Sequence, residues 1–183
     1  MIETEWFDIV DEENRVIGKA TREQCHDGSK LLHPVVHVHI FNSDKKLLLQ
    51  KRNVDKDIQP GKWDTSIGGH IQSGELVEDA IRRESLEEAG IAINHAELLP
   101  IAKYVFESDI EKELVFSYAY AYDGPIIFQE SEIDEVRFFD HEEVTALIAS
   151  GEATPNFVQE FSLLATANHH IFAKLGKRIF AFN

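Results

Sequence analysis

The sequence predicts a single α/β domain built on a mixed β-sheet. Short runs in which apolar and other residues alternate occur in the first half of the chain and again in its middle, which is typical of strands. Stretches with apolar residues at helical spacing lie between and after these runs. A chain of 183 residues suits one domain with a sizeable core. We therefore expect one domain over residues 1–183.

The first elements expected are a short hairpin and a helical turn. Trp6–Val10 and Val16–Ala20 are β-like runs on either side of a polar turn, so they predict an N-terminal β-hairpin extension within about residues 1–25. A single helical turn is expected over Thr21–Cys25.

A second hairpin is expected directly afterwards. Apolar residues alternate with His37 and His39 up to Phe41, and a polar turn then leads into the run Leu47–Arg52. We expect each strand of this hairpin to have one apolar face. The two histidines either line a cleft or face a helix, and the helix is the preferred interpretation.

Helices and strands alternate in the rest of the chain. A helix is expected over Glu75–Ala89, with Gly90 as its stop. A short helix near His141–Ser150 and an amphipathic helix over about residues 156–175 are expected at the end. The strands predicted between these helices are Leu98–Phe106, Leu114–Tyr122 and Val136–Phe139.

Composition excludes several classes of function. With 18 Lys and Arg against 33 Asp and Glu, the formal net charge is −15, which leaves no broad basic surface for duplex nucleic acid. The longest apolar runs are far shorter than the ~20 residues of a membrane span, and the acidic N-terminus is unlike a secretory signal. A single cysteine, Cys25, excludes an internal disulfide. We expect a cytoplasmic protein with a small-molecule substrate and no membrane partner, either a monomer or a homodimer.

The first long helix predicted carries the clearest chemical signal. At ~100° per residue, Glu87 and Glu88 lie within about 60° of Glu84, so three carboxylates share one helix face. Like charges at this spacing repel one another, and a divalent cation would remove the repulsion. Carboxylate oxygens suit Mg²⁺ or Mn²⁺, which bridge protein carboxylates and substrate phosphates. The nearby Gly68 and Gly69 let backbone carbonyls approach the same ion.

Residues 69–91 resemble the box of the Nudix hydrolase family, G-x5-E-x7-R-E-U-x-E-E-x-G-U, in which U is aliphatic. Ser85 departs from the box, because the family places an aliphatic residue there. The resemblance implies a Nudix-type α/β/α sandwich with a mixed β-sheet. The positions that match in register are Gly69, Glu75, Arg83, Glu84, Glu87, Glu88, Gly90 and Ile91.

The resemblance further implies that the chain hydrolyses a diphosphate linkage in a nucleoside diphosphate-type or other small anionic metabolite. Arg83 would then orient the carboxylates, and Glu75 would support them or act as the base. The implied ligands of the Mg²⁺ or Mn²⁺ ion are Glu84, Glu87 and Glu88, with the carbonyl of Gly68 or Gly69. A later acid often completes such a site, and the candidates here are Glu130, Glu132 and Glu135.

A second resemblance is to type 1 isopentenyl-diphosphate isomerases, which share the Nudix fold and hold a metal through three histidines and two glutamates. The residues whose spacing matches that metal site are His26, His33, His70, Glu111 and Glu113. Arg22, Arg52 and Lys56 fall where that branch has residues facing the diphosphate. The catalytic cysteine of the isomerases, however, aligns with Gly68, so the proton donor is missing.

Three functions follow as alternatives. A Mg²⁺-dependent diphosphate hydrolase is the leading hypothesis, because the box carboxylates are complete. An isomerase of isoprenoid diphosphates is the second. The third is a binding module that has lost catalysis, and the intact Glu84, Glu87 and Glu88 argue against it.

Overall fold

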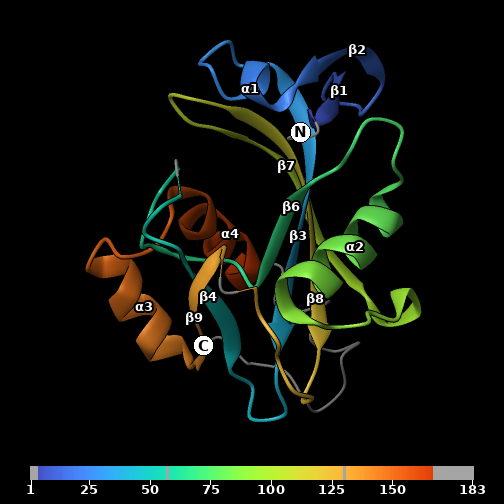
Figure 1. Ribbon diagram of the computed structural model, residues 1–183. Helices are drawn as coiled ribbons and strands as arrows, with labels where there is room; N and C mark the ends of the chain where they lie inside the picture. Colours follow the sequence, from blue (N-terminus) through green and yellow to red (C-terminus); the bar gives the residue numbers. More distant parts are fainter. Residues whose placement is uncertain (1–3, 57, 130, 167–183) are drawn as a thin grey trace.

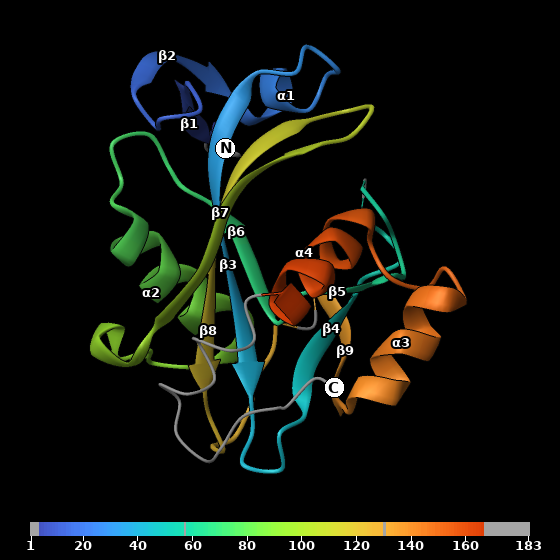
Figure 2. The ribbon, with the colours of Figure 1, turned by 180° about the vertical axis from the view of Figure 1, so that it is seen from behind.

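The computed structural model describes residues 4–56, 58–129 and 131–166. A mixed sheet lies between helices on both faces, which agrees with the α/β/α sandwich expected (Figure 1). Helix α2 (Val77–Ala89) covers one face, and α3 (His141–Ala149) and α4 (Pro155–Thr166) cover the other, as the view from behind also shows (Figure 2).

The large sheet has seven strands, and two of them each pair with three neighbours. Its main path is β5–β4–β3–β8–β7, while β6 also pairs with β3 and β9 with β4. Among the strand pairs of the described residues, only β3–β8 is parallel, which makes the sheet mixed. The bounds are β3 (Leu32–Phe41), β4 (Leu47–Arg52), β5 (Trp63–Asp64), β6 (Ile67–His70), β7 (Leu99–Glu107), β8 (Lys112–Ala121) and β9 (Ile133–Phe139).

The predicted N-terminal hairpin is confirmed. β1 (Trp6–Val10) and β2 (Val16–Thr21) form an antiparallel pair, and the helical turn α1 (Arg22–Cys25) follows with a capping box at Thr21. This extension lies at one end of the large sheet, beside the connection between β7 and β8, where Gly28 N–H donates to the carbonyl of Ile110 at 2.9 Å (Figure 1). It therefore closes one end of the region where the candidate site lies.

The strands of the second predicted hairpin are confirmed. β3 and β4 pair only at Phe41 and Leu47 and then diverge, because β6 and β8 flank β3 while β5 and β9 flank β4. Every residue of β3 is buried, so the histidine face of this strand is covered as well as its apolar face. One face packs on α2 through Val36, Val38 and Ile40, and the other carries the histidines toward α4.

The start of the first long helix needs correction. The helix predicted from Glu75 begins at Val77, because Glu75 belongs to the turn in which its own carboxylate accepts from the backbone of Gln72. Gly68 and Gly69 belong to strand β6, although a glycine pair on its own is more typical of a turn. Gly90 ends α2 in the left-handed conformation, at φ 66°, as predicted.

The remaining elements lie close to their predicted positions. The short 3₁₀ turn His95–Glu97 was not predicted, and α4 is described only to Thr166, so the rest of the helix expected to residue 175 lies outside the described residues. Among the described helices, none is long and apolar enough to cross a lipid bilayer.

Candidate active site

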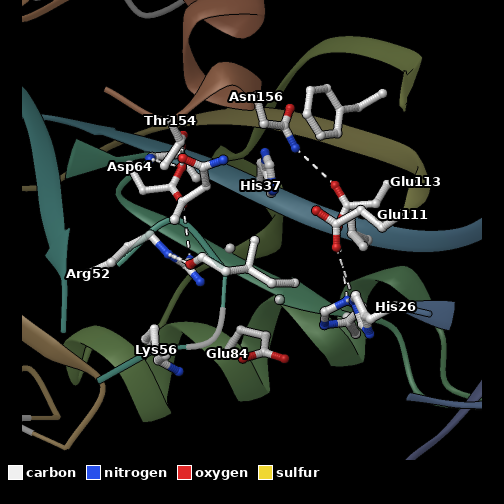
Figure 3. A pocket seen from close by; sticks show the side chains of 18 of the residues that line it. His26, His37, Arg52, Lys56, Asp64, Glu84, Glu111, Glu113, Thr154 and Asn156 are labelled. Atoms are coloured by element: carbon white, nitrogen blue, oxygen red, sulfur yellow. Dashed lines mark hydrogen bonds and ion pairs between the residues drawn. The ribbon is translucent and has the colours of Figure 1, made fainter. Parts of the chain in front are cut away.

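A cavity of about 920 Å³ is the setting of the candidate site. It is lined by residues of the N-terminal extension, by β3, β4 and β6, by the C-terminal half of α2, by the β7–β8 connection and by the start of α4. Residues from opposite ends of the cavity are labelled in Figure 3, with Arg52 and Lys56 on one side and His26 and Glu111 on the other. Polar side chains that are far apart in the sequence therefore line the same cavity.

The three box carboxylates lie together in this cavity, as the helix geometry predicts. Glu84, Glu87 and Glu88 all line it. Glu88 is fixed by two donors, the backbone N–H of Gly68 at 3.0 Å and the side-chain amide of Gln50 at 3.3 Å. Sequence reasoning missed Gln50, which is buried on β4 and was predicted only as part of an apolar strand.

Arg83 holds the cluster and joins it to the turn before α2. Its guanidinium makes two hydrogen bonds to the carboxylate of Glu75, at 3.0 and 2.9 Å, and a third to the carbonyl of His70. Nη1 reaches Glu84 at 2.6 Å and Glu87 at 3.4 Å. The planar fork of arginine suits this bidentate contact. The structure thus places Arg83 and Glu75 where they can orient the acids.

Burial raises the pKa of two of these carboxyl groups. Removal from water raises the pKa of Glu84 to about 7, although the adjacent Arg83 acts in the opposite direction. Burial and the charge of Glu84 raise the pKa of Glu88 to about 8. Carboxylates that are costly to ionise side by side become favourable in the ionised form when a divalent cation lies between them. The donor set therefore fits Mg²⁺ or Mn²⁺.

Gly69 makes room for this cluster. A Cβ at position 69 would overlap the carboxyl group of Glu84, so the acid occupies the space of the absent side chain. Ser85, the one departure from the box, is fully buried, and its hydroxyl donates to the carbonyl of Ile81 at 2.6 Å. The hydroxyl is thus satisfied within the helix, and the departure leaves the acid cluster unchanged.

The three predicted phosphate-binding cations all line the cavity, each paired with an acid. Arg22 contacts Glu5 at 3.1 Å, Arg52 contacts Asp64 at 3.2 Å, and Lys56 contacts Glu132 at 2.8 Å. Of the late acids proposed from the sequence, Glu132 lines the cavity and Glu135 is exposed on β9. Glu130 lies outside the described residues. Glu132 is therefore the later acid that the structure brings to the site.

The three histidines of the second predicted metal site converge. One ring nitrogen from each of His26, His33 and His70 lies within 4.8 Å of the others. The Nε2 atoms of His26 and His70 are 3.1 Å apart. Nδ1 of His33 lies 2.8 Å from the carbonyl of Leu31, to which it donates, so its Nε2 is left as an acceptor. Nδ1 of His26 lies 2.7 Å from the carbonyl of Arg22, and its Nε2 faces the carboxylate of Glu111. In the described part of the chain, the buried Nε2 of His33 has no hydrogen-bond partner.

Strand register explains this convergence. His33 of β3 is opposite Glu113 of β8, and His70 of β6 is opposite Val35, two residues along the same face of β3. Glu111 lies 3.1 Å from Nε2 of His26, and Glu113 lies 3.9 Å from Nε2 of His70. Burial, reinforced by the neighbouring imidazoles and Arg22, holds the pKa of His70 well below its ordinary value. Neutral imidazoles with free nitrogens are the form that binds metals.

Aromatic packing supports the histidine cluster from outside. The ring of Phe7, in β1, stacks on His70 with centroids 4.5 Å apart and an interplanar angle of 3°. It also stacks on His33 at 5.6 Å. Phe7 was not singled out from the sequence, where it is one more apolar residue of a predicted strand. The hairpin extension therefore orients two of the three imidazoles.

Cys25 and Trp63 have structural roles. Cys25, beside His26 in the sequence, is fully buried, and burial raises the pKa of its thiol to about 11, so it is a packed thiol. Trp63 is buried against Phe139 in the core. Trp6, in contrast, is 43% exposed with Lys19 over its ring.

Comparison with known proteins gives the family. A model described as the NUDIX domain matches residues 31–161. The chain belongs to the Nudix hydrolase family. It is 37% identical over 166 residues to an uncharacterized Nudix hydrolase of Yersinia pestis, covering 90% of this chain and 88% of that one. It is 35% identical over 166 residues to the uncharacterized Nudix hydrolase YfcD of Escherichia coli K12, with coverages of 90% and 89%.

Solved structures of Nudix proteins share the fold. DR0079 from Deinococcus radiodurans superposes with a TM-score of 0.71 at 29% identity, covering 86% of this chain and 96% of that one. The Nudix domain of NrtR from Shewanella oneidensis, solved as a complex with ADP-ribose, superposes with a TM-score of 0.60 at 16% identity, covering 75% and 88%. This Nudix enzyme therefore has the family's fold, and its box residues lie in the cavity described above.

Proposed function

We propose that this Nudix hydrolase cleaves a diphosphate linkage in a small anionic metabolite, of the kind present in nucleoside diphosphates, and that it depends on Mg²⁺ or Mn²⁺. The observation that carries the proposal is the position of Glu84, Glu87 and Glu88 in the same cavity as Arg22, Arg52 and Lys56. Acids alone would repel a diphosphate. Acids that hold a divalent cation, faced by basic side chains, can bind one.

The ion would be held by Glu84, Glu87 and Glu88, with the carbonyl of Gly68 or Gly69. When bound, it would neutralise phosphate oxygens and lower the pKa of a water molecule. The chain's own contribution is to place the groups around the reacting phosphorus. Arg83 fixes the carboxylates, and one of these, or Glu75, accepts the proton of the attacking water.

The basic residues would bind the phosphates after exchanging their present partners. Arg52 and Lys56 now pair with Asp64 and Glu132, and a diphosphate carries more negative charge than either carboxylate. Glu132, freed from Lys56, is the acid positioned to complete the carboxylate set. ADP-ribose, the ligand of the NrtR domain, contains a diphosphate linkage and therefore belongs among the substrates to test.

We also propose that His26, His33 and His70, with Glu111 and Glu113, form a second cation site in this cavity. Three nitrogens and two carboxylates suit a first-row transition metal such as Zn²⁺ or Mn²⁺ better than Mg²⁺, which prefers oxygen ligands. The site would hold a second positive charge beside the diphosphate. It does not by itself make the chain an isomerase, because Gly68 has no side chain to donate a proton.

The experiment that tests the proposed function is a substrate panel. Nucleoside di- and triphosphates, ADP-ribose and isoprenoid diphosphates are incubated with the protein and Mg²⁺, and release of phosphate, pyrophosphate or a nucleoside monophosphate is measured. We expect release from at least one nucleotide, abolished by EDTA and strongly reduced in Glu88→Gln. No release from any compound, with Mg²⁺ or Mn²⁺, would contradict the proposal.

A further inference from the structure

One of the two glutamates of the second cation site is held by a residue that lies outside that site. Nδ2 of Asn156, in the first turn of α4, donates to Oε2 of Glu113 at 2.9 Å, as the dashed line between them in Figure 3 shows. Oε1 of Glu113 lies 3.9 Å from Nε2 of His70, which is too far for a hydrogen bond. Of these two contacts, only that of Asn156 is close enough to set the direction of the carboxylate.

The orientation of the Asn156 amide follows from its two partners. The hydroxyl of Tyr104, in β7, donates to Oδ1 of Asn156 at 2.7 Å. An ionised carboxylate only accepts hydrogen bonds, so the amide nitrogen must face Glu113 and the amide oxygen must face the hydroxyl. The ring of Tyr104 packs against a buried apolar cluster that consists of Val35, Phe106 and Val115. The amide is therefore fixed at both of its ends.

The start of α4 is held on both sides of Asn156. Before it, the hydroxyl of Thr154 donates to Oδ1 of Asp64 at 2.8 Å. After it, the carboxylate of Glu160, which is 1% exposed, lies 2.8 Å from Nδ1 of His37 in β3. The backbone of Asn156 is thus kept in place by contacts other than those of its own amide.

The two oxygens of Glu113 differ in what they can do. Because Oε2 is occupied by the amide, Oε1 is the oxygen on the side of His70, where the ring nitrogens of the three histidines converge. A carboxylate that already has this orientation loses less conformational freedom when a cation binds. Hydrogen bonds of this kind to a metal ligand typically change the affinity for the metal by about ten- to a hundredfold.

We propose that Asn156 is a positioning residue of the second cation site, which holds Oε2 of Glu113 so that Oε1 faces the imidazoles. The inference rests on the second cation site of the proposed function. It makes the start of α4 necessary for cation binding, although the ligands proposed for the site all come from other elements.

A double-mutant cycle tests this role. Co²⁺ affinity is measured by visible absorption on the full chain, without substrate, for the parent, Asn156→Ala, Glu113→Ala and the double variant. We expect Asn156→Ala to weaken Co²⁺ binding by about tenfold when Glu113 is present. When Glu113 is absent, the same substitution should weaken binding by less than about twofold, because the amide then has no ligand to hold.

Two further variants separate the hydrogen bond from other effects of the substitution. Asn156→Leu keeps the approximate volume of the side chain but has no donor, so it should show the same loss as Asn156→Ala. Gln159→Ala removes an exposed amide from the same helix and should bind Co²⁺ as the parent does.

Several results would overturn the proposal. An equal loss with and without Glu113 would mean that Asn156 acts on the fold and not through the carboxylate. Parent-like binding by Asn156→Ala or Asn156→Leu, or a parent that binds no Co²⁺, would also refute it. The two proposals can fail separately. If the loss depends on Glu113 but the parent cleaves nothing in the panel, the positioning role stands and the hydrolase proposal fails. If cleavage occurs and Asn156→Ala binds Co²⁺ as the parent does, only the positioning role fails.

Discussion

The carboxyl group of Glu84 occupies the space in which a side chain of residue 69 would begin. The acid is held there by Arg83, whose Nη1 lies 2.6 Å away. Gly69 is not among the described glycines with positive φ, so the requirement for glycine at this position is steric and comes from the acid cluster. The box requires a glycine at position 69, and in this structure that glycine makes room for Glu84, a candidate catalytic group.

Gly69→Ala should lower turnover by at least about tenfold with little change in the fold, because the methyl group must displace Glu84 by more than an ångström, a shift known to be costly at a reacting centre. Steady-state kinetics with Mg²⁺ and circular dichroism measure the two effects. Gly18→Ala is the matched control, since a Cβ there would meet its nearest atom at an ordinary 3.8 Å. Unchanged turnover in Gly69→Ala would show that Glu84 is free to move without consequence.

Glu87→Gln and Glu88→Gln should each lower turnover by roughly 10²–10⁴, the range for loss of a group that transfers a proton or its equivalent. Both side chains line the cavity with Glu84. Glu78→Gln, an exposed acid in the first turn of the same helix, is the control and should behave as the parent. Parent-like turnover in both cavity variants at saturating Mg²⁺ would rule out the box carboxylates as the reaction centre.

Divalent cations should stabilise the protein more at high pH than at low pH. In the metal-free state, the pKa of Glu84 is raised to about 7 and that of Glu88 to about 8. A carboxyl group with a raised folded-state pKa stabilises the fold below its unfolded pKa, and this contribution is lost as the pH rises through the folded value. The melting temperature of the metal-free protein should therefore fall by several degrees between about pH 6 and pH 9.

Millimolar Mg²⁺ replaces the lost protons, so its stabilising effect should be larger at pH 8.5 than at pH 6. Thermal melts of EDTA-treated protein check both trends, with NaCl at equal ionic strength as the control. Glu88→Gln should flatten the pH profile. A melting temperature that Mg²⁺ and Mn²⁺ leave unmoved at either pH would argue against a preformed ion site.

The histidine cluster should bind Co²⁺, whose visible absorption reports the nitrogen ligands independently of catalysis. Buried Nε2 atoms at this separation are preorganised for an ion. His33→Gln should remove most of the Co²⁺ absorption, whereas His141→Gln, on α3 and outside the cavity, should retain it. Identical Co²⁺ spectra for the parent and His33→Gln would place the bound ion elsewhere.

The chain should not isomerise isopentenyl diphosphate. Isomerisation needs a proton added at one carbon and removed from another, and Gly68 provides no donor where the isomerases have a cysteine. Incubation with isopentenyl diphosphate in heavy water and Mg²⁺ checks this, with deuterium in the dimethylallyl product as the signal. Enzyme-dependent deuterium uptake would mean that another residue replaces the cysteine.

The order and type of the main elements could be predicted because periodicity is a local property. The failures have non-local causes. The twin glycines of β6 read as a turn in isolation, and they form a strand because β3 pairs with both residues. The apolar face of β3 could be predicted, but the acid that meets its imidazoles could not, because α4 brings Glu160 there from a distant part of the chain.

Some residues of the candidate site could likewise be predicted from the sequence, and others could not. The box acids, Arg83 and the histidines of the proposed second cation site could be predicted because their spacing follows a known family pattern. Gln50, Phe7 and Glu160 could not, since each contacts a residue of the cavity wall from a strand or helix whose position depends on the whole sheet. Glu160 did leave a signal, as a lone acid between Phe157 and Phe161 on the apolar side of a predicted helix.

The complete burial of β3 has a consequence for how this sequence can vary. His37 lines the cavity and His33 belongs to the buried histidine cluster, while Val36 and Val38 between and beyond them point to the core under α2. Inserting or deleting one residue in the strand would exchange these two sets, so that imidazoles would enter the apolar layer and valines would replace the polar wall. Substitutions can be tolerated there one position at a time, but changes of length cannot. Natural variation in length should therefore be confined to the connections on either side of this strand.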